Sequence, residues 1–290
     1  MANSKITPFL WFDSNAEEAI NFYTSVFANS SVQSLMRMPD GKVMTAGFQL
    51  NGQGFAALNG GPMYKFNPAT SFFVVCETKE EANEIWHTLT TDGQTLMPLD
   101  AYPWSAWYGW GQDRFGVSWQ VMLNAKGENQ QQLLPCLMFA GELLERADEA
   151  VNFYVSTFKN AKTVKIDRYT EGEPAPTGSI KYAEFDLEGL TFTIMGSHLP
   201  HNFQFNEAIS FVINCQNQAE IDDYWQKLTE NGGQEGRCGW LKDKFGVSWQ
   251  VVPTNLGTLL SGNNDGAKAQ RAMQAMMQMN KLDIAALQNA

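Results

Sequence analysis

A seven-residue segment that occurs twice constrains the fold of this chain more than any other feature. Phe115–Val121 reads FGVSWQV, and Phe245–Val251 repeats the same seven residues in the second half of the chain. An aspartate and a basic residue precede each copy, and Trp110 or Trp240 lies a few positions earlier. A repeat with such a long period indicates an internal duplication. We therefore expect two similar domains in tandem.

The composition indicates a globular protein that binds neither nucleic acid nor membranes. The chain has 290 residues, of which 44% are hydrophobic and 18% charged, as in proteins with a substantial core. Its formal net charge of -11 opposes binding to polyanions, because phosphate binding needs clustered lysine and arginine. There is no apolar run of membrane-spanning length, no signal-peptide pattern and no cysteine spacing typical of metal sites. We expect a cytoplasmic protein.

The first half contains two consecutive segments with the same order of predicted elements. Ile6–Phe12 is expected to be a strand, and Ser14–Glu17 has the pattern of a capping box that begins a helix. Three strands follow this helix, with a tight hairpin at the Asn-Gly pair 51–52. The order begins again at the predicted strand Ser71–Cys76, followed by a second capping box at Thr78–Glu81. One half therefore comprises two β-α-β-β-β modules.

The second half repeats this order in detail. Asn152–Tyr154 copies Asn21–Tyr23, and Cys215 copies Cys76 in the strand that opens each second module. The sequence therefore predicts the α+β class, with helices that each present one apolar stripe to a sheet.

We place the predicted domain boundaries at the ends of the repeats. The first domain covers residues 1–125, the second covers 133–260, and 261–290 form a helical tail without a counterpart in the first half. A glutamine-rich segment at 124–132 is expected to link the two. The Met-rich helix at 269–279 is expected to dock on the core, although a methionine stripe can also bind partners.

Four stretches resemble a known family: Thr7–Phe12, Leu58–Pro62, Ser210–Cys215 and the block from Cys238 to Gln250. They are similar to the PhnB-like group of the vicinal oxygen chelate (glyoxalase/bleomycin-resistance) superfamily, which often carries the label 3-demethylubiquinone-9 3-methyltransferase domain. The resemblance implies two glyoxalase-like domains, in which paired β-α-β-β-β modules form curved mixed sheets around a cup for a small ligand. It also implies a fused pseudo-dimer in one polypeptide, for which a monomer is one expected state.

Metal-dependent members of the superfamily place histidine, glutamine or glutamate at four positions that point into the cup. Counted from local anchors, the resemblance places these positions at Pro8 and Pro135, Ala57 and Ile194, Ser71 and Ser210, and Gln120 and Gln250. Proline and alanine side chains have no donor atom, and serine and glutamine are poor ligands for transition metals. We therefore predict no metal. No nucleotide-binding fingerprint is present either, so we predict no cofactor.

The predicted ligand-binding residues are polar or aromatic residues that the repeat and the resemblance place in the cups. They are Ser71, Tyr108, Trp110, Gln120, Ser210, Trp240 and Gln250. A buried glutamine must be hydrogen-bonded, so Gln120 either has a protein partner or binds a ligand. The aromatic residues between Tyr102 and Trp110 are interpreted as a loop that either covers the first cup or packs between the halves.

Two histidines are the only catalytic candidates. His198 and His201 lie in a loop whose counterpart in the first half has no histidine. Imidazole could serve there as a general base or as half of a metal site. The alternative is that both are surface residues without a role.

These patterns support three hypotheses for function. The first is metal-independent binding of a small hydrophobic or aromatic molecule in the cup. The second is an enzyme of the lyase, isomerase or dioxygenase kind, with methyl transfer suggested by the family label alone. The third is an interaction scaffold that uses the Met-rich tail. The sequence leaves open whether the protein is an enzyme.

Overall fold

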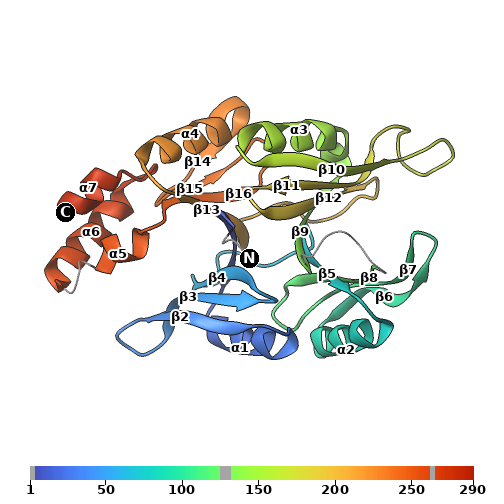
Figure 1. Cartoon of the computed structure of the whole chain (residues 1–290), viewed down its shortest axis with the longest axis horizontal. Helices are drawn as coiled ribbons and strands as arrows, with labels where there is room; N and C mark the ends of the chain where they lie inside the picture. Colours follow the sequence, from blue (N-terminus) through green and yellow to red (C-terminus); the bar gives the residue numbers. More distant parts are fainter. Residues whose placement is uncertain (1–3, 125–131, 262–264) are drawn as a thin grey trace. The chain divides into compact units, whose positions relative to one another are not determined.

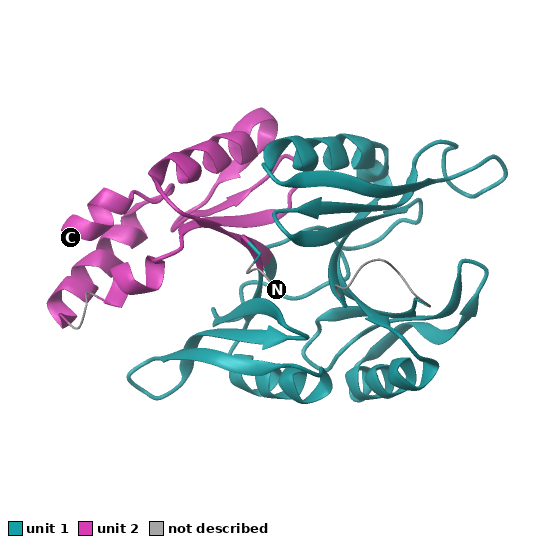
Figure 2. Cartoon of the chain, viewed as in Figure 1, with its two compact units in different colours: residues 1–4, 8–209 teal, residues 5–7, 210–290 magenta. Residues whose placement is uncertain are grey.

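The computed structural model describes residues 4–124, 132–261 and 265–290. The chain divides into two compact units, which Figure 2 shows in different colours. The first unit contains residues 1–4 and 8–209, and the second contains residues 5–7 and 210–290. Most of the expected linker at 124–132 lies outside the described residues, and the domain boundaries stay a prediction.

The first half confirms the predicted order of two β-α-β-β-β modules. The first module contains β1 (Ile6–Phe12), α1 (Ala16–Val26), β2 (Ser31–Arg37), β3 (Val43–Leu50) and β4 (Gln53–Asn59). The second contains β5 (Thr70–Cys76), α2 (Lys79–Thr90), β6 (Gln94–Tyr102), β7 (Ser105–Gln112) and β8 (Ser118–Leu123).

The second half repeats both modules and adds the helical tail. Its first module contains β9 (Leu133–Ala140), the short helix η1 (Gly141–Arg146), α3 (Ala147–Thr157), β10 (Ala161–Arg168), β11 (Ile180–Leu187) and β12 (Leu190–Ser197). Its second contains β13 (Ile209–Cys215), α4 (Gln218–Thr229), η2 (Glu230–Gly232), β14 (Gln234–Glu235), β15 (Trp240–Lys242) and β16 (Ser248–Pro253). The tail contains α5 (Leu256–Ser261), α6 (Gly266–Gln278) and α7 (Ile284–Asn289).

One complete mixed sheet lies within the first unit, and it combines modules from both halves. Its strand order is β10-β11-β12-β9-β5-β8-β7-β6. At its centre β5 pairs antiparallel with β9, with Ser71 opposite Cys136. Almost every residue of these two strands is buried, as expected for strands at the centre of a sheet. In Figure 1 this sheet curls so that α2 and α3 lie on its outer side.

The remaining strands form a similar set within each unit. In the first unit β1 pairs parallel with β4, and β4, β3 and β2 continue as antiparallel neighbours. In the second unit β13 pairs parallel with β16, which continues antiparallel to β15 and β14. The β3–β4 hairpin turns at Asn51 and Gly52, both with positive φ, which confirms the predicted tight turn.

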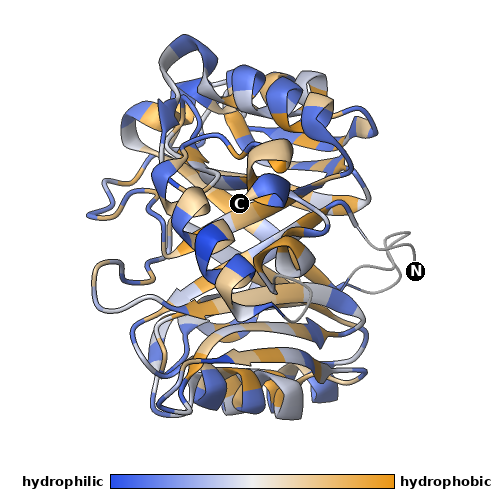
Figure 3. Cartoon of the chain, turned by 90° about the vertical axis from the view of Figure 1, so that its left-hand side faces the viewer, coloured by the Kyte–Doolittle hydropathy of each residue, from blue (hydrophilic) through white to orange (hydrophobic). Residues whose placement is uncertain are grey.

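The helices bury one stripe each, and this confirms the predicted amphipathic pattern. Helix α1 buries Ile20 and Tyr23, and α2 buries Ala82 and Leu89. In Figure 3 the helices alternate between hydrophilic and hydrophobic residues, whereas hydrophobic residues concentrate on the strands. The sheets therefore provide most of the core, and the helices cover it.

The predicted capping box of α1 is wrong. The residue before the helix is Asn15, not Ser14 as the box predicts, and its side chain makes no cap bond. The Ala16 N–H instead donates to Oδ1 of Asn59 at 2.9 Å. Asn59 in turn donates to the carbonyl of Val43 at 2.8 Å. A residue distant in sequence therefore satisfies the free N–H at the start of the helix. The predicted cap of α2 is confirmed, because Thr78 Oγ1 accepts from the N–H of the fourth box residue.

The aromatic segment that we interpreted as a loop is part of a β-hairpin, as the predicted order of three strands after α2 requires. Strands β6 and β7 meet at a short turn, where the rings of Tyr102 and Trp104 stack with centroids 5.0 Å apart. Glycines alternate with aromatic residues along β7. A Cβ on Gly109 would lie 2.9 Å from the ring of Trp86 on α2. The glycines therefore let α2 pack closely, and the intervening aromatic side chains point to the other face.

A buried carboxylate explains the repeated segment. Asp113 is 3% exposed, and its Oδ2 accepts hydrogen bonds from Tyr23 Oη and Trp119 Nε1, both at 2.8 Å. Its Oδ1 accepts from the N–H groups of Phe115 and Val117. Burial raises the pKa of the Asp113 carboxyl, although these hydrogen bonds act in the opposite direction.

The second copy repeats three of these bonds. Asp243 accepts from the N–H groups of Phe245 and Val247 and from Trp249 Nε1. In both copies the glycine of the segment has a φ of 90°, which L-residues with a side chain rarely adopt. The repeated segment is therefore a structural unit that holds the entry to β8 and β16.

The C-terminal tail packs on the second unit. The N–H groups of Cys238 and Gly239 donate to the carbonyls of Met279 and Asn280, both at 2.8 Å. Leu282 is fully buried, whereas Met277 is 56% exposed. The expected docking is thus confirmed for Leu282 but not for the whole methionine stripe.

We expect Asp113→Asn to lower the free energy of unfolding by about 2 to 4 kcal/mol, because an amide cannot accept from all four donors. Urea denaturation followed by circular dichroism measures this change. The control is Asp40→Asn in an exposed turn, for which we expect less than about 0.5 kcal/mol. Equal effects of the two substitutions would contradict the structural role of Asp113.

Candidate functional site

The candidate site lies on the face of the β5–β12 sheet opposite α2 and α3, which we call the inner face. Neighbouring residues on paired strands point to the same side of a sheet. Ser71 lies opposite Cys136, and Cys136 lies opposite Thr193. Gln120 lies beside Trp110. Ser71, Cys136, Thr193 and Gln120 are each at most 1% exposed. These four residues form the floor of the inner face, and Trp110 lies at its side.

A chain of neutral hydrogen bonds occupies this floor. The Tyr108 hydroxyl donates to Gln120 Oε1 at 2.6 Å, and Gln120 Nε2 donates to Ser71 Oγ at 2.8 Å. Beside it, Trp110 Nε1 donates to Ser118 Oγ at 2.9 Å. Buried polar groups need such partners. The protein itself therefore satisfies Gln120, which decides the alternative left open by the sequence.

Cys136 is the one thiol on the floor, and it is protonated near neutral pH. Burial raises the pKa of Cys136 to about 11, although Thr193, Ser71 and Gln120 nearby favour the thiolate. The Thr193 hydroxyl also donates to the carbonyl of Pro135 at 3.2 Å. No group on this floor carries a charge near pH 7.

Four of the positions carried over from the family were counted one residue away from the inward-pointing ones. Pro135 lies opposite Phe72, and Ile194 lies beside Leu137, all on the helix-covered side of the sheet. In the first module Ala57 likewise lies beside Leu10, and Pro8 has the same strand parity as Leu10. In the β5–β12 sheet, the residues that point inward are Cys136 and Thr193. Sequence reasoning missed both, because their position depends on the pairing of β5 with β9, which joins the two halves. In the sequence, the alternation of side chains along each strand was the only available signal for which residues point inward.

The corrected residues do not fit a divalent metal. Ser71, Gln120 and Thr193 offer neutral oxygens, and Cys136 would have to lose a proton that burial retains. Gln120 Oε1 already accepts a bond from Tyr108. Within residues 4–124, 132–261 and 265–290, no cluster of three or more His, Cys, Asp or Glu side chains could hold a metal ion.

Apolar and aromatic side chains surround the floor. Phe73, Tyr108, Leu134 and Cys136 form a buried cluster on the inner face. Half-buried residues pack against it: Val75, Met97, Tyr102, Trp110, Met122, Tyr182 and Met195. Because these side chains keep part of their surface exposed, a ligand on the inner face would contact mainly rings, methyl groups and thioethers.

The structure places the other predicted binding residues in the second unit. Gln250 Nε2 donates to Ser210 Oγ at 3.0 Å, and Trp240 lies beside Gln250. The position of Tyr108 in the repeat is taken by Cys238, so this copy has no phenol next to its glutamine. The seven predicted residues therefore form two groups: four in the first unit and three in the second.

The candidate histidines lie away from the floor. His201 Nε2 is 2.9 Å from Ser197 Oγ, and its ring stacks on Phe203 with centroids 4.7 Å apart. Burial lowers the pKa of His201. His198 is exposed. Because Ser197 is four residues beyond Thr193 on an extended strand, this pair is about 13 Å from the floor.

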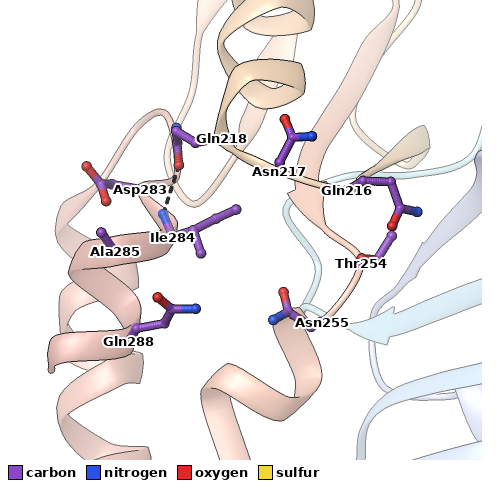
Figure 4. Close-up of a pocket in the computed structure, with 9 residues that line it drawn as sticks. All are labelled: Gln216, Asn217, Gln218, Thr254, Asn255, Asp283, Ile284, Ala285 and Gln288. Atoms are coloured by element: carbon purple, nitrogen blue, oxygen red, sulfur yellow. Dashed lines mark hydrogen bonds between the residues drawn. The ribbon is translucent and has the colours of Figure 1, made fainter.

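A polar cavity of about 580 Å³ lies elsewhere, in the second unit. Figure 4 shows it between the start of α4, the segment before α5, and α7. Gln218 in its wall accepts from the Ile284 N–H at 2.9 Å and donates to the Leu282 carbonyl at 3.0 Å. These bonds hold the tail, and no residue predicted from the sequence lines the cavity.

Comparison with known families agrees with this geometry. The profile of the 3-demethylubiquinone-9 3-methyltransferase family matches residues 4–122 and 131–252. The chain belongs to this family. The resemblance to PhnB-like proteins of the vicinal oxygen chelate superfamily is thereby confirmed, with one copy of the domain in each half.

Solved structures show where this PhnB-like chain lies among related folds. The PhnB protein of Bacillus cereus is 44% identical over 41% of this chain and 98% of its own length, with a TM-score of 0.40. Glyoxalase I from Zea mays is 12% identical over 90% of this chain and 95% of its own, with a TM-score of 0.58. A protein described as a dioxygenase from Bacillus subtilis is 9% identical over 96% of this chain and 91% of its own, with a TM-score of 0.51. The last two likenesses show the glyoxalase-like fold alone.

No functionally curated protein matches the PhnB-like chain. Among the helices of the described residues, none is long and apolar enough to cross a membrane.

We expect the native PhnB-like protein to react with iodoacetamide at one cysteine, Cys238. Cys76, Cys136 and Cys215 are fully buried, whereas Cys238 is half-buried. Burial raises the pKa of the Cys238 thiol as well. The rate at which iodoacetamide alkylates Cys238 should therefore still rise with pH above 8, since the thiolate is the nucleophile. Mass spectrometry after alkylation identifies the modified residues.

Cys238→Ser should abolish labelling of the native protein, and urea should expose the other thiols. Rapid labelling of Cys136 at neutral pH would show that the floor is open to water and its thiol ionised.

Proposed function

We propose that this PhnB-like protein binds a small aromatic or otherwise apolar molecule on the inner face, without a metal. The observation that supports this most directly is a neutral, internally hydrogen-bonded floor surrounded by half-buried aromatic and methionine side chains. Ligand sites are typically lined by apolar groups with a few polar ones. Methionine side chains adapt to ligands of irregular shape.

Binding is favoured over acid–base chemistry by the state of the floor groups. Burial raises the pKa of Cys136 to about 11 and also raises that of Tyr108. A general base should have a pKa near the working pH, and neither group meets this condition. The floor also provides no charged side chain that could assist the methyl transfer named in the family description.

The proposal also concerns partners and location. We infer a small-molecule ligand from the family's cup, and a cytoplasmic location from the lack of a signal-peptide pattern and of an apolar run of membrane-spanning length in the sequence. That the protein binds no nucleic acid stays a prediction, as does the monomeric state expected of a fused pseudo-dimer.

Phenylnaphthylamine, a neutral probe that fluoresces in apolar surroundings, tests the proposal. We expect saturable binding to the native protein. Met195→Lys should weaken it about tenfold, because the substitution places an ammonium group on the apolar lining. The matched control is Met277→Lys on α6, whose side chain is already 56% exposed and which should bind the probe normally.

Circular dichroism and the thermal midpoint establish that both variants fold. If Met195→Lys does not fold, Met97→Lys introduces the same charge from β6. Absence of saturable binding by the native protein, or equal loss in the Met277→Lys control, would contradict the proposal.

A further inference from the structure

We infer that the inner face takes a small aromatic cation, whose positive group lies against Glu184. This inference rests on the proposed function and narrows the class of ligand. It derives from one charged side chain that sequence reasoning did not single out.

Glu184 points to the inner face from β11. It lies opposite Thr193 in the register of β11 with β12, and Thr193 lies beside Cys136. The carboxylate is thus two strands from Cys136, or about 10 Å at the usual strand spacing. Its side chain is half-buried. A ligand that covers the apolar lining would therefore reach Glu184 at one end.

The neighbour that binds this carboxylate is neutral. Tyr182 Oη donates to Glu184 Oε1 at 2.8 Å. Burial and the nearby Glu184 carboxylate both raise the pKa of the Tyr182 phenol, so the phenol keeps its proton. One neutral hydrogen bond leaves most of the acceptor capacity of the carboxylate available.

Two other carboxylates on β10 and β11 form ion pairs with lysines, but Glu184 does not. Asp186 pairs with Lys162 at 3.4 Å, and Asp167 pairs with Lys165 at 2.7 Å. Lys165 lies opposite Glu184 in the β10–β11 register, yet its ammonium bonds Asp167. Among the described residues no ion pair to Glu184 occurs. A half-buried carboxylate without a cation favours the binding of one.

Aromatic rings next to Glu184 would add to this preference. The Tyr182 ring lies edge to face with Phe73, with centroids 6.1 Å apart. The Lys165 ammonium is 5.7 Å from the Tyr182 centroid, so a cation already lies near this ring. Ring faces attract cations at such distances, most strongly where water is excluded. An aromatic ammonium ion would combine ring contacts with a charge for Glu184.

The repeat shows that this feature belongs to one copy. Strand β11 reads IKYAEFDL, and its counterpart β3 reads VMTAGFQL. Glu184 thus corresponds to Gly47, and Tyr182 corresponds to Thr45. The duplication retained the strand and its core residues, but the carboxylate and the phenol occur only on the inner face of the β5–β12 sheet.

Three probes of similar size test the inference: phenyltrimethylammonium, its neutral isostere tert-butylbenzene, and benzenesulfonate. Ligand-observed NMR gives a Kd for each with the full-length protein. We expect the cation to bind about tenfold more tightly than the neutral isostere, and the anion to bind more weakly than both. The quaternary nitrogen keeps its charge at every pH.

Variants assign the preference to Glu184. Glu184→Gln keeps the size of the side chain, and it should reduce cation affinity about tenfold while leaving tert-butylbenzene binding unchanged. Lys165→Met removes the competing ammonium and should strengthen cation binding. Glu171→Gln, in an exposed turn, makes the same change in net charge as Glu184→Gln and should have no effect.

The possible outcomes separate this inference from the proposed function. If the neutral probe binds as well as the cation and Glu184→Gln changes neither, the cation preference is overturned and the apolar site remains. If the sulfonate binds best, the preference is likewise overturned. If none of the probes binds, and phenylnaphthylamine does not bind either, the proposed function fails as well.

Discussion

The antiparallel pairing of β5 with β9 is the interaction on which the candidate site depends. It joins the second module of the first half to the first module of the second half, with Ser71 opposite Cys136. Each half contributes two of the four floor residues, so neither half contains this floor alone. Both strands are buried almost throughout, and hydrophobic burial therefore fixes the register that brings these polar side chains together.

The same burial determines the chemistry of the site. Transition-metal centres favour imidazole, carboxylate and thiolate ligands, whereas this floor consists of an amide, two hydroxyls and a protonated thiol. The hydrogen bonds from Tyr108 to Gln120 and from Gln120 to Ser71 use the groups that would otherwise be open to an ion. What remains accessible is a rim of rings and thioethers with one carboxylate, Glu184, at its edge. This combination suits recognition by contact area and charge.

Much of the architecture could be predicted because its causes are local. Helical spacing, the Asn-Gly turn and the repeated segment placed the modules correctly, and the duplication revealed the tandem domains. The predictions failed where residues distant in the sequence determine the local structure. Asn59 on β4 accepts from the first N–H of α1, where a residue at the helix start was expected to cap it. The aromatic stretch ending at Trp110 pairs as a strand with its neighbours, and Trp86 of α2 packs closely on its Gly109. Neither partner can be read from the local sequence.

By itself the sequence determined the duplication, the α+β class and the acidic net charge, since these follow from periodicity and composition. Only the tertiary structure decided that Cys136 and Thr193, not Pro135 and Ile194, share the floor with Gln120. It also decided that Glu184 points to the same face. The physical reason is that a shift of one residue along a strand reverses the direction of every side chain, and the register is set by pairing between segments that are distant in the chain.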